Sequence, residues 1–526
     1  MKVFKRGMKN IVFGLISQFV ILGIGILLPK LFVENYGSGV NGLFSSMSQI
    51  FGYVALLEAG LGAATVQALY NPISSDNREE ISSVLSATKI YYNRVSFYYL
   101  MCVIALSVLY PFVTKIDDIG VGIFGITSPA AIRISIGLVT LLSGLSGVIN
   151  FYFQATLKQL MIAEGRQYVI SNITMIVDVL LSIAKIALVL IGADIVLIQL
   201  SYFIIRVLQM VLYTSYYRRH YSWVDFKAKP NFSALRQRNA FLIHQITNLI
   251  SNSTDVMLLS VFKDFKSASI YAIYNTVISA LNTLCSTVNQ SLNFILGITY
   301  HKDKNRYLRL HDAYNTYFIT FIFSIMTVCY MLFEPFIGIY MKNADIDYNL
   351  PYLPLMFCVI QMLSSTRVIS NNLISISGHV PQTMMRSAIQ AAINLGLSLI
   401  LIKPLGIYGV LIGTIVSLLY RTTDTLLYTD LKILKRNPIK SYKPVIINFS
   451  TFAVAAWINR FIHLDFSGYE KTLEAFGHFL IYGLIYSIII IPAYFIINSL
   501  LAPKSFSFVF DIIKRKLNKR KKSEVN

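Results

Sequence analysis

The chain of 526 residues is 55% hydrophobic and only 13% charged, and its mean hydropathy is +0.60. These values exclude an ordinary soluble protein of this length and indicate a polytopic membrane protein. The formal net charge of +21 would suit nucleic-acid binding by a soluble domain, but the positive-inside rule accounts for it without nucleic acid. If the N-terminus is placed in the cytoplasm, most lysines and arginines fall in alternate, inward-facing segments, so we expect both termini to be cytoplasmic.

The first predicted elements are two membrane-spanning helices between Asn10 and Tyr70, joined by a tight turn. The apolar run from Ile11 to Val33 is long enough to cross about 30 Å of hydrocarbon at about 1.5 Å per residue. The second helix, from Val40 to Tyr70, is unusually polar and carries Glu58. An ionised side chain is costly near the bilayer centre, so we expect the polar side of this helix to face protein or a hydrated cavity.

Further apolar segments give an all-α protein with about fourteen transmembrane helices. The later predicted spans cover residues 84–113, 132–157, 169–191, 195–217, 239–261, 269–298, 313–338, 351–375, 383–402, 407–430, 444–462 and 473–500. We divide the chain into an N-lobe (1–217), a cytoplasmic inter-lobe loop (218–238), a C-lobe (239–430), two extra spans (431–502) and a basic cytoplasmic tail (503–526). Apolar residues at helical spacing between Ser505 and Leu517 predict a tail helix on the inner leaflet, in contact with membrane lipids.

The two halves show a weak internal repeat. Residues 193–198 resemble residues 407–412, and the sequence Leu-Tyr-Thr at 212–214 recurs at 427–429. The offset of the second match places Arg206 on Arg421. A repeat in this order predicts two pseudo-symmetric six-helix lobes around a central lumen, the plan of transporters that rock two halves around a central site.

Basic residues within the spans are the first candidates for a binding site, because a buried charge in a membrane is rare without a function. Arg206 and Arg367 have no acidic residue nearby in the sequence, and guanidinium groups match phosphate oxygens in paired hydrogen bonds. Both are therefore candidates for binding an anionic ligand.

Two other basic residues have an acidic neighbour on the same helix. Arg421 lies three residues before Asp424, and Asp178 lies two turns before Lys185. Each pair is expected either to form a buried ion pair or to serve the function directly. The G-x-x-x-G sequence that ends at Gly413 predicts close packing of its helix against another.

Acidic residues within the spans are candidates for coupling transport to an ion gradient. Glu58 lies in the second span and Asp255 in the seventh, and Asp178 is a third candidate. Each of them either binds the proton or sodium ion that drives transport or is a structural carboxyl group.

Catalytic and nucleotide-binding motifs are absent from the sequence. It contains no G-x-x-x-x-G-K-[ST], no H-E-x-x-H and no G-x-S-x-G. The triplet Asp345-Ile346-Asp347 lies in a short outward loop, where we expect it to be solvated. We therefore expect no enzyme activity, no catalytic residue, no metal and no cofactor.

The opening stretch resembles bacterial polysaccharide repeat-unit flippases of the Wzx type, within the multidrug/oligosaccharidyl-lipid/polysaccharide exporter superfamily. The residues that carry the resemblance are Asn41-Gly42-Leu43, the stretch from Leu57 to Gly62 and the stretch from Leu69 to Pro72. The resemblance is sharp over roughly the first hundred residues and rests elsewhere on the span count and the repeat.

The resemblance implies that the protein moves an undecaprenyl-diphosphate-linked oligosaccharide from the cytoplasmic to the outer leaflet of the bacterial plasma membrane. Polysaccharide polymerase and export proteins are then expected partners in making capsule, O-antigen or exopolysaccharide. The two extra spans look like those of lipid II flippases, which carry several arginines in their first two spans. This chain has none there, so the cationic role falls to Arg206, Arg367 and Arg421.

Two other functions stay open from the sequence. A cation-coupled multidrug exporter of the same superfamily would need acidic residues in its lumen, and Glu58 and Asp255 would serve there. A membrane-embedded polysaccharide polymerase or glycosyltransferase would need a sizeable catalytic loop, which the sequence does not contain.

Overall fold

The structure is a computed structural model that describes residues 2–58, 60–114, 126, 128–235, 254–377, 379–462, 472–511 and 514. Along some helical stretches, residues 2–26 and 284–295 among them, only the backbone is described. Ten helices in the described part are long and apolar enough to cross a membrane. The all-α, polytopic class is therefore confirmed. Most of the predicted seventh span, residues 239–253, lies outside the described residues.

The chain forms two compact units. The first comprises Met1–Ile273 with two short later segments, Ala344–Ile346 and Ile402–Ile407, and the second comprises Tyr274–Asn343, Asp347–Leu401 and Tyr408–Asn526. The inter-lobe loop predicted at 218–238 falls within the first unit. The helix α10 (Phe265–Lys302) begins in the first unit and continues into the second.

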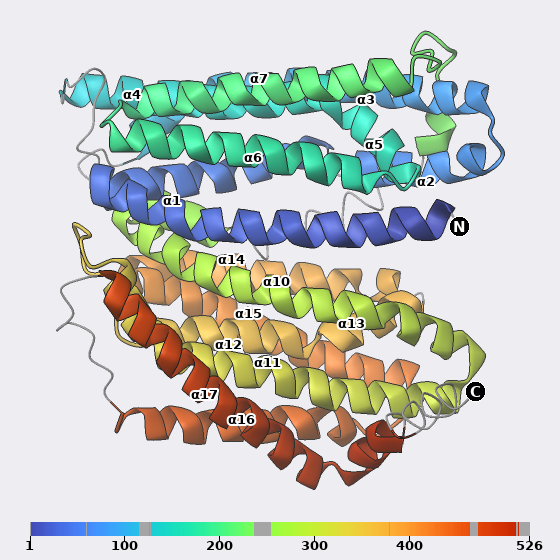
Figure 1. Cartoon of the computed structure of the whole chain (residues 1–526), viewed down its shortest axis with the longest axis vertical. Coiled ribbons are helices and arrows are strands. Elements are labelled where there is room, and N and C mark those ends of the chain that lie inside the picture. Colours follow the sequence, from blue (N-terminus) through green and yellow to red (C-terminus); the bar gives the residue numbers. More distant parts are fainter. Residues whose placement is uncertain are drawn as a thin grey trace. The chain divides into compact units, whose positions relative to one another are not determined.

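The first unit contains long helices that run side by side, with α6 next to α7 (Figure 1). Its elements are α1 (Lys2–Val54), η1 (Ala55–Glu58), α2 (Leu61–Ser74), α3 (Arg78–Val113), α4 (Pro129–Ile149), η2 (Asn150–Gln154), α5 (Ala155–Ala163), α6 (Gln167–Leu190), α7 (Ile195–His220), η3 (Phe232–Leu235) and α9 (Asp255–Phe262). One core of this unit lies where α1, α4 and α7 meet, around the fully buried Val40, Ile136 and Ile198.

The predicted turn between the first two spans lies at Gly37 within α1, whose φ of +82° interrupts the helical geometry. Only glycine adopts this conformation without strain. The backbone N–H of the next residue, Ser38, donates a hydrogen bond of 2.9 Å to Oδ1 of Asp345. The carboxylate satisfies a helical N–H that the break leaves without an intrahelical acceptor. Asp345, which the sequence places in a solvated loop, therefore has a structural contact.

The prediction of one continuous helix from Val40 to Tyr70 is wrong. The chain leaves α-helical geometry after Val54, passes through the 3₁₀ turn η1 and starts again as α2. Gly60, at the start of α2, has a φ of +80°, a left-handed conformation that ends helices. The break places Glu58 at the end of a turn and not within a regular helix.

The second unit contains the remaining helices. They are α10, α11 (Lys304–Tyr340), α12 (Leu353–Thr366), α13 (Val368–Ile376), α14 (Val380–Leu405), α15 (Ile407–Tyr428), η4 (Thr429–Ile433), α16 (Ile439–Asn459) and α17 (Thr472–Leu501). A Cβ atom added at Gly409 would lie 2.2 Å from the carbonyl oxygen of Leu401. One added at Gly413 would lie 2.6 Å from the hydroxyl of Ser398. The G-x-x-x-G sequence therefore lets α15 approach α14 closely, which confirms the packing prediction.

The two extra helices, α16 and α17, pack on α11 (Figure 1). Asn448 and Asn498 exchange amide hydrogen bonds of 3.0 and 3.1 Å between them, and both side chains are fully buried. The hydroxyl groups of Tyr494 and Thr327 lie 2.7 Å apart and connect α17 to α11. Beyond α17, residues 503–511 are helical, and the rest of the predicted tail helix up to Leu517, apart from residue 514, lies outside the described residues.

Candidate functional site

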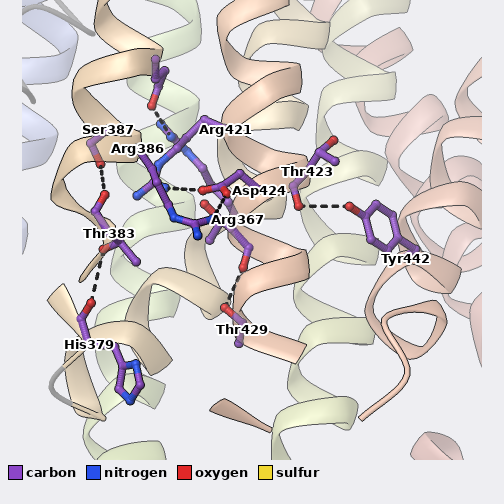
Figure 2. A network of polar contacts seen from close by, with 12 residues as sticks. Arg367, His379, Thr383, Arg386, Ser387, Arg421, Thr423, Asp424, Thr429 and Tyr442 are labelled. Atoms are coloured by element: carbon purple, nitrogen blue, oxygen red, sulfur yellow. Dashed lines mark hydrogen bonds and ion pairs between the residues drawn. The ribbon is translucent and has the colours of Figure 1, made fainter. Parts of the chain in front are cut away.

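Three arginines of the second unit gather around one carboxylate (Figure 2). We call this the arginine cluster, and it consists of Arg367, Arg386, Arg421 and Asp424. Arg367 lies at the junction of α12 and α13, Arg386 lies on α14, and the other two lie on α15. The close packing of α14 on α15 brings the side chains together.

Asp424 is held by two of the arginines. Its Oδ2 accepts a hydrogen bond of 2.9 Å from Nη1 of Arg421, and its Oδ1 is bonded to Nη1 of Arg386. The Asp424 side chain is 13% exposed and that of Arg421 6%, whereas that of Arg386 is 39% exposed. Arg386 is therefore the member of the ion-paired group that reaches the surface of the unit.

Arg367 has a neutral partner. Its Nη1 donates a hydrogen bond of 2.9 Å to Oε1 of Gln390, and its positive charge lies close enough to Arg421 for repulsion. Across the described ranges, no carboxylate pairs with Arg367. The cluster thus holds three guanidinium groups and one carboxylate, and it carries excess positive charge.

Aromatic side chains orient the exposed arginine. The guanidinium of Arg386 lies over the ring of Tyr428, 4.9 Å from its centroid. The Tyr428 hydroxyl lies 2.9 Å from Nδ1 of His379. A cation over an aromatic face is stabilised by the ring quadrupole, so Arg386 is held between Tyr428 and Asp424.

The first unit contains a second group of charges, which we call the mixed cluster: Lys158, Lys185, Arg206, Asp178 and Glu58. Nη2 of Arg206 lies 3.3 Å from Oδ1 of Asp178, an ion pair between α7 and α6. Lys185 and Arg206 both lie over the ring of Tyr202, each 5.0 Å from its centroid. Lys158 interacts electrostatically with Arg206 and with Glu58. Three cations therefore share two acids, and positive charge is again in excess.

Glu58 and Lys158 meet at a place where helices are interrupted. The Glu58 carboxyl is hydrogen-bonded to Tyr92, and Nζ of Lys158 donates to Oδ1 of Asn150 over 2.6 Å. Asn150 begins η2, a π-helical turn between α4 and α5. Such turns often mark functional sites.

Asp255 lies apart from the mixed cluster, in the first turn of α9. Its Oδ2 accepts a hydrogen bond of 2.7 Å from the hydroxyl of Tyr271 on α10. The neighbouring Thr254 is hydrogen-bonded to Tyr53 of α1. Asp255 thus belongs to the contacts that connect three helices of the first unit.

Some of the predicted contacts form and others are replaced. Arg421 and Asp424 pair as their spacing predicts. Arg206 has no acidic residue near it in the sequence, but α6 packs against α7 and brings Asp178 to it. The same contact means that the Asp178 carboxylate meets Arg206 as well as the predicted Lys185.

Arg386 and Lys158 belong to these clusters but were not among the predicted site residues. Both were counted with the inward-facing basic residues, Arg386 near the start of the predicted span 383–402 and Lys158 just after the predicted span 132–157. Both lie within helices, Arg386 on α14 and Lys158 on α5. The signal that could have found Arg386 is its position within the predicted span 383–402. For Lys158 the chain is helical as far as Ala163, so the helix continues well beyond the predicted end of the span at residue 157.

Comparison with known proteins identifies the fold. No family model and no curated protein matches the sequence. A solved structure of the lipid II flippase MurJ in an inward closed conformation matches at 16% identity and a TM-score of 0.66, over 96% of this chain and 100% of that chain. The chain has the fold of this transporter.

Two other solved structures also match the fold of this chain. A multidrug resistance MATE family transporter of the MOP superfamily, in an inward-facing conformation, matches at 15% identity and a TM-score of 0.63, over 79% of this chain and 95% of that one. The MATE multidrug transporter DinF-BH in complex with R6G matches at 17% identity and a TM-score of 0.54, over 81% and 95% of the two chains. With the apolar helices, this fold makes the chain a multi-pass membrane protein.

Proposed function

We propose that the protein is a flippase for an undecaprenyl-diphosphate-linked oligosaccharide repeat unit, which it moves from the cytoplasmic to the outer leaflet of a bacterial plasma membrane. The observation that carries the proposal is the arginine cluster. A group of three guanidiniums with one carboxylate is costly in an apolar helical unit unless an anion joins it. Guanidinium groups bind phosphate oxygens through paired, charge-assisted hydrogen bonds.

The substrate chemistry suits this arrangement. A prenyl-diphosphate-sugar carries its negative charge on the diphosphate, its polarity on the sugars and its hydrophobicity on the prenyl chain. The arginine cluster replaces water around the diphosphate, while the prenyl chain stays in the lipid. Alternating access then exposes the bound head group to the opposite side of the membrane, so that no covalent chemistry is needed.

Two further observations support the proposal. MurJ, whose structure shares this fold, is a lipid II flippase, and the opening residues of this chain resemble repeat-unit flippases. The mixed cluster adds Arg206 and two lysines to the positive charge available for the head group.

A cation-coupled multidrug exporter is the second candidate, because the MATE transporters share the fold. An exporter of cations would need acids that an incoming cation can reach. Asp178 is already paired with Arg206, and Asp255 accepts a hydrogen bond from Tyr271. Glu58 is hydrogen-bonded to Tyr92 and lies near Lys158, at the end of η1. It stays a candidate for binding a coupling proton or sodium ion, and both functions can use it in that role.

The test is made in cells that lack the protein. We expect lipid-linked oligosaccharide to accumulate in the inner leaflet and surface polymer to be lost, and the intact chain to restore both. The double variant R367A/R386A should fail to restore them at equal expression. R133A is the matched control, since Arg133 lies over the Phe112 ring at the start of α4 and outside both clusters. Normal polymer together with greater sensitivity to cationic drugs would overturn the flippase in favour of the exporter.

A further inference from the structure

Asp424 occupies the position in the arginine cluster where an anionic ligand would bind. Both of its oxygens are engaged by guanidinium groups, Oδ2 by Arg421 and Oδ1 by Arg386. A carboxylate and a phosphate present the same kind of paired oxygens to a guanidinium. A ligand phosphate that reaches Arg386 must therefore compete with Asp424.

The two arginines are placed differently for this competition. The Arg421 side chain is 6% exposed and lies three residues before Asp424 on the same helix, so the pair forms within α15. The Arg386 side chain is 39% exposed, comes from α14 and has Tyr428 beside it. Arg386 is the member that an incoming anion meets first, and Arg421 is the member that stays with the carboxylate.

We propose that Asp424 is an internal competitor for the substrate's diphosphate, and that Arg386 exchanges between Asp424 and the substrate. This inference rests on the proposed function. When substrate binds, Arg386 moves to a phosphate and Arg421 keeps Asp424 neutralised. When substrate leaves, Asp424 takes Arg386 back, which limits how tightly the diphosphate is held and lets it be released on the far side.

The charge of the cluster fits this exchange. Three guanidiniums and one carboxylate leave two positive charges in excess, and a diphosphate that is esterified at both ends carries two negative charges. Arg367, whose hydrogen-bond partner is the neutral Gln390, is available to a second phosphate without breaking an ion pair. Asp424 thus sets the affinity of the site and is a specificity-determining residue that need not touch the substrate.

The experiment measures binding and transport separately. Full-length protein in lipid nanodiscs is titrated with an undecaprenyl-diphosphate-linked sugar, whose diphosphate is esterified at both ends, and transport is followed by surface polymer in cells. D424N keeps the shape of the side chain and removes its charge. We expect diphosphate to bind on the order of tenfold more tightly, and surface polymer to fall because release becomes slow. A merely structural ion pair predicts weaker binding together with lower transport.

Two further variants make the outcomes distinct. E34Q removes one carboxylate from the Lys30–Glu34 pair of α1 and should leave binding unchanged. In D424N/R421Q the buried guanidinium of Arg421 is removed together with the carboxylate that it pairs with, and Arg386 still lacks its competitor. If D424N does not fold, this double variant should therefore show the tighter binding.

The results separate this inference from the proposed function. Unchanged or weaker diphosphate binding by D424N and D424N/R421Q, with binding lost in R367A, would overturn the role of Asp424 and leave the flippase intact. Wild-type protein that does not bind the undecaprenyl-diphosphate-linked sugar would overturn the proposed function itself.

Discussion

The ion pair between Asp178 and Arg206 gives a prediction whose magnitude follows from the structure. At the observed 3.3 Å, Coulomb's law with an effective dielectric constant of about 20 gives an attraction of about 5 kcal/mol. The side chains are 25% and 23% exposed, so solvent screening and the loss of hydration leave a net coupling of about 1–2 kcal/mol. D178N should cost more than R206Q, because R206Q leaves Lys185 close to Asp178, whereas D178N leaves three cations with Glu58 alone.

The assay is a double-mutant cycle on protein in detergent. The unfolding midpoints of D178N, R206Q and the double variant are compared with the wild type under one scan rate, since unfolding of such proteins is often irreversible. A control cycle combines D178N with R133Q, where Arg133 contacts the Phe112 ring and not the acid, and its effects should add. Midpoint shifts of D178N and R206Q that add in the double variant, as they do in the control cycle, would refute the ion pair.

Three further predictions concern other parts of the chain. G409A should lower the free energy of unfolding by about 1–3 kcal/mol, because the new Cβ would lie 2.2 Å from a backbone carbonyl of α14. G396A is the control and should not lower it, because no atom lies within 4 Å of its added Cβ. N448A should cost about 1–3 kcal/mol by leaving the buried amide of Asn498 without one partner, and N448L/N498L should cost less than twice that amount. If Glu58 binds the coupling proton, transport by E58Q into vesicles should no longer respond to an imposed pH gradient, and a response equal to wild type would contradict this role.

The sequence predicts the fold well where the signal is local. The helices α6 and α7 begin and end within three residues of the apolar segments that predict them, because an unbroken apolar run leaves few ways to end a helix in a membrane. The close contact of Gly409 with α14 also follows from its motif. The break at Gly60 does not, since a glycine within a helical pattern is often tolerated and its left-handed conformation depends on the packing around η1.

In the candidate site, too, contacts within one helix are predicted and contacts between helices are not. Arg421 and Asp424 share one helix face, so their ion pair is readable from spacing alone. The pair formed by Arg206 and Asp178 depends on which helices become neighbours and on their register, and neither quantity is fixed by an apolar pattern. Arg386 was missed as a site residue for a similar reason: a basic residue near the start of a predicted span is expected to reach the membrane surface, and only the packing of α14 on α15 shows that it meets Asp424.

The ion pairs Arg206–Asp178 and Arg386–Asp424 lie at corresponding places in the two predicted lobes. In each unit the pair connects the last two helices of a predicted lobe, α6 with α7 in the first and α14 with α15 in the second. The polarity is reversed, because the acid lies on α6 in the first unit and on α15 in the second. The aligned arginines, Arg206 and Arg421, therefore take their acids from different places, one from a neighbouring helix and one from its own. In the second arrangement Asp424 keeps Arg421 of its own helix, so Arg386 of the neighbouring helix can exchange its partner. For this reason we assign the diphosphate to the arginine cluster and a supporting role to the mixed cluster.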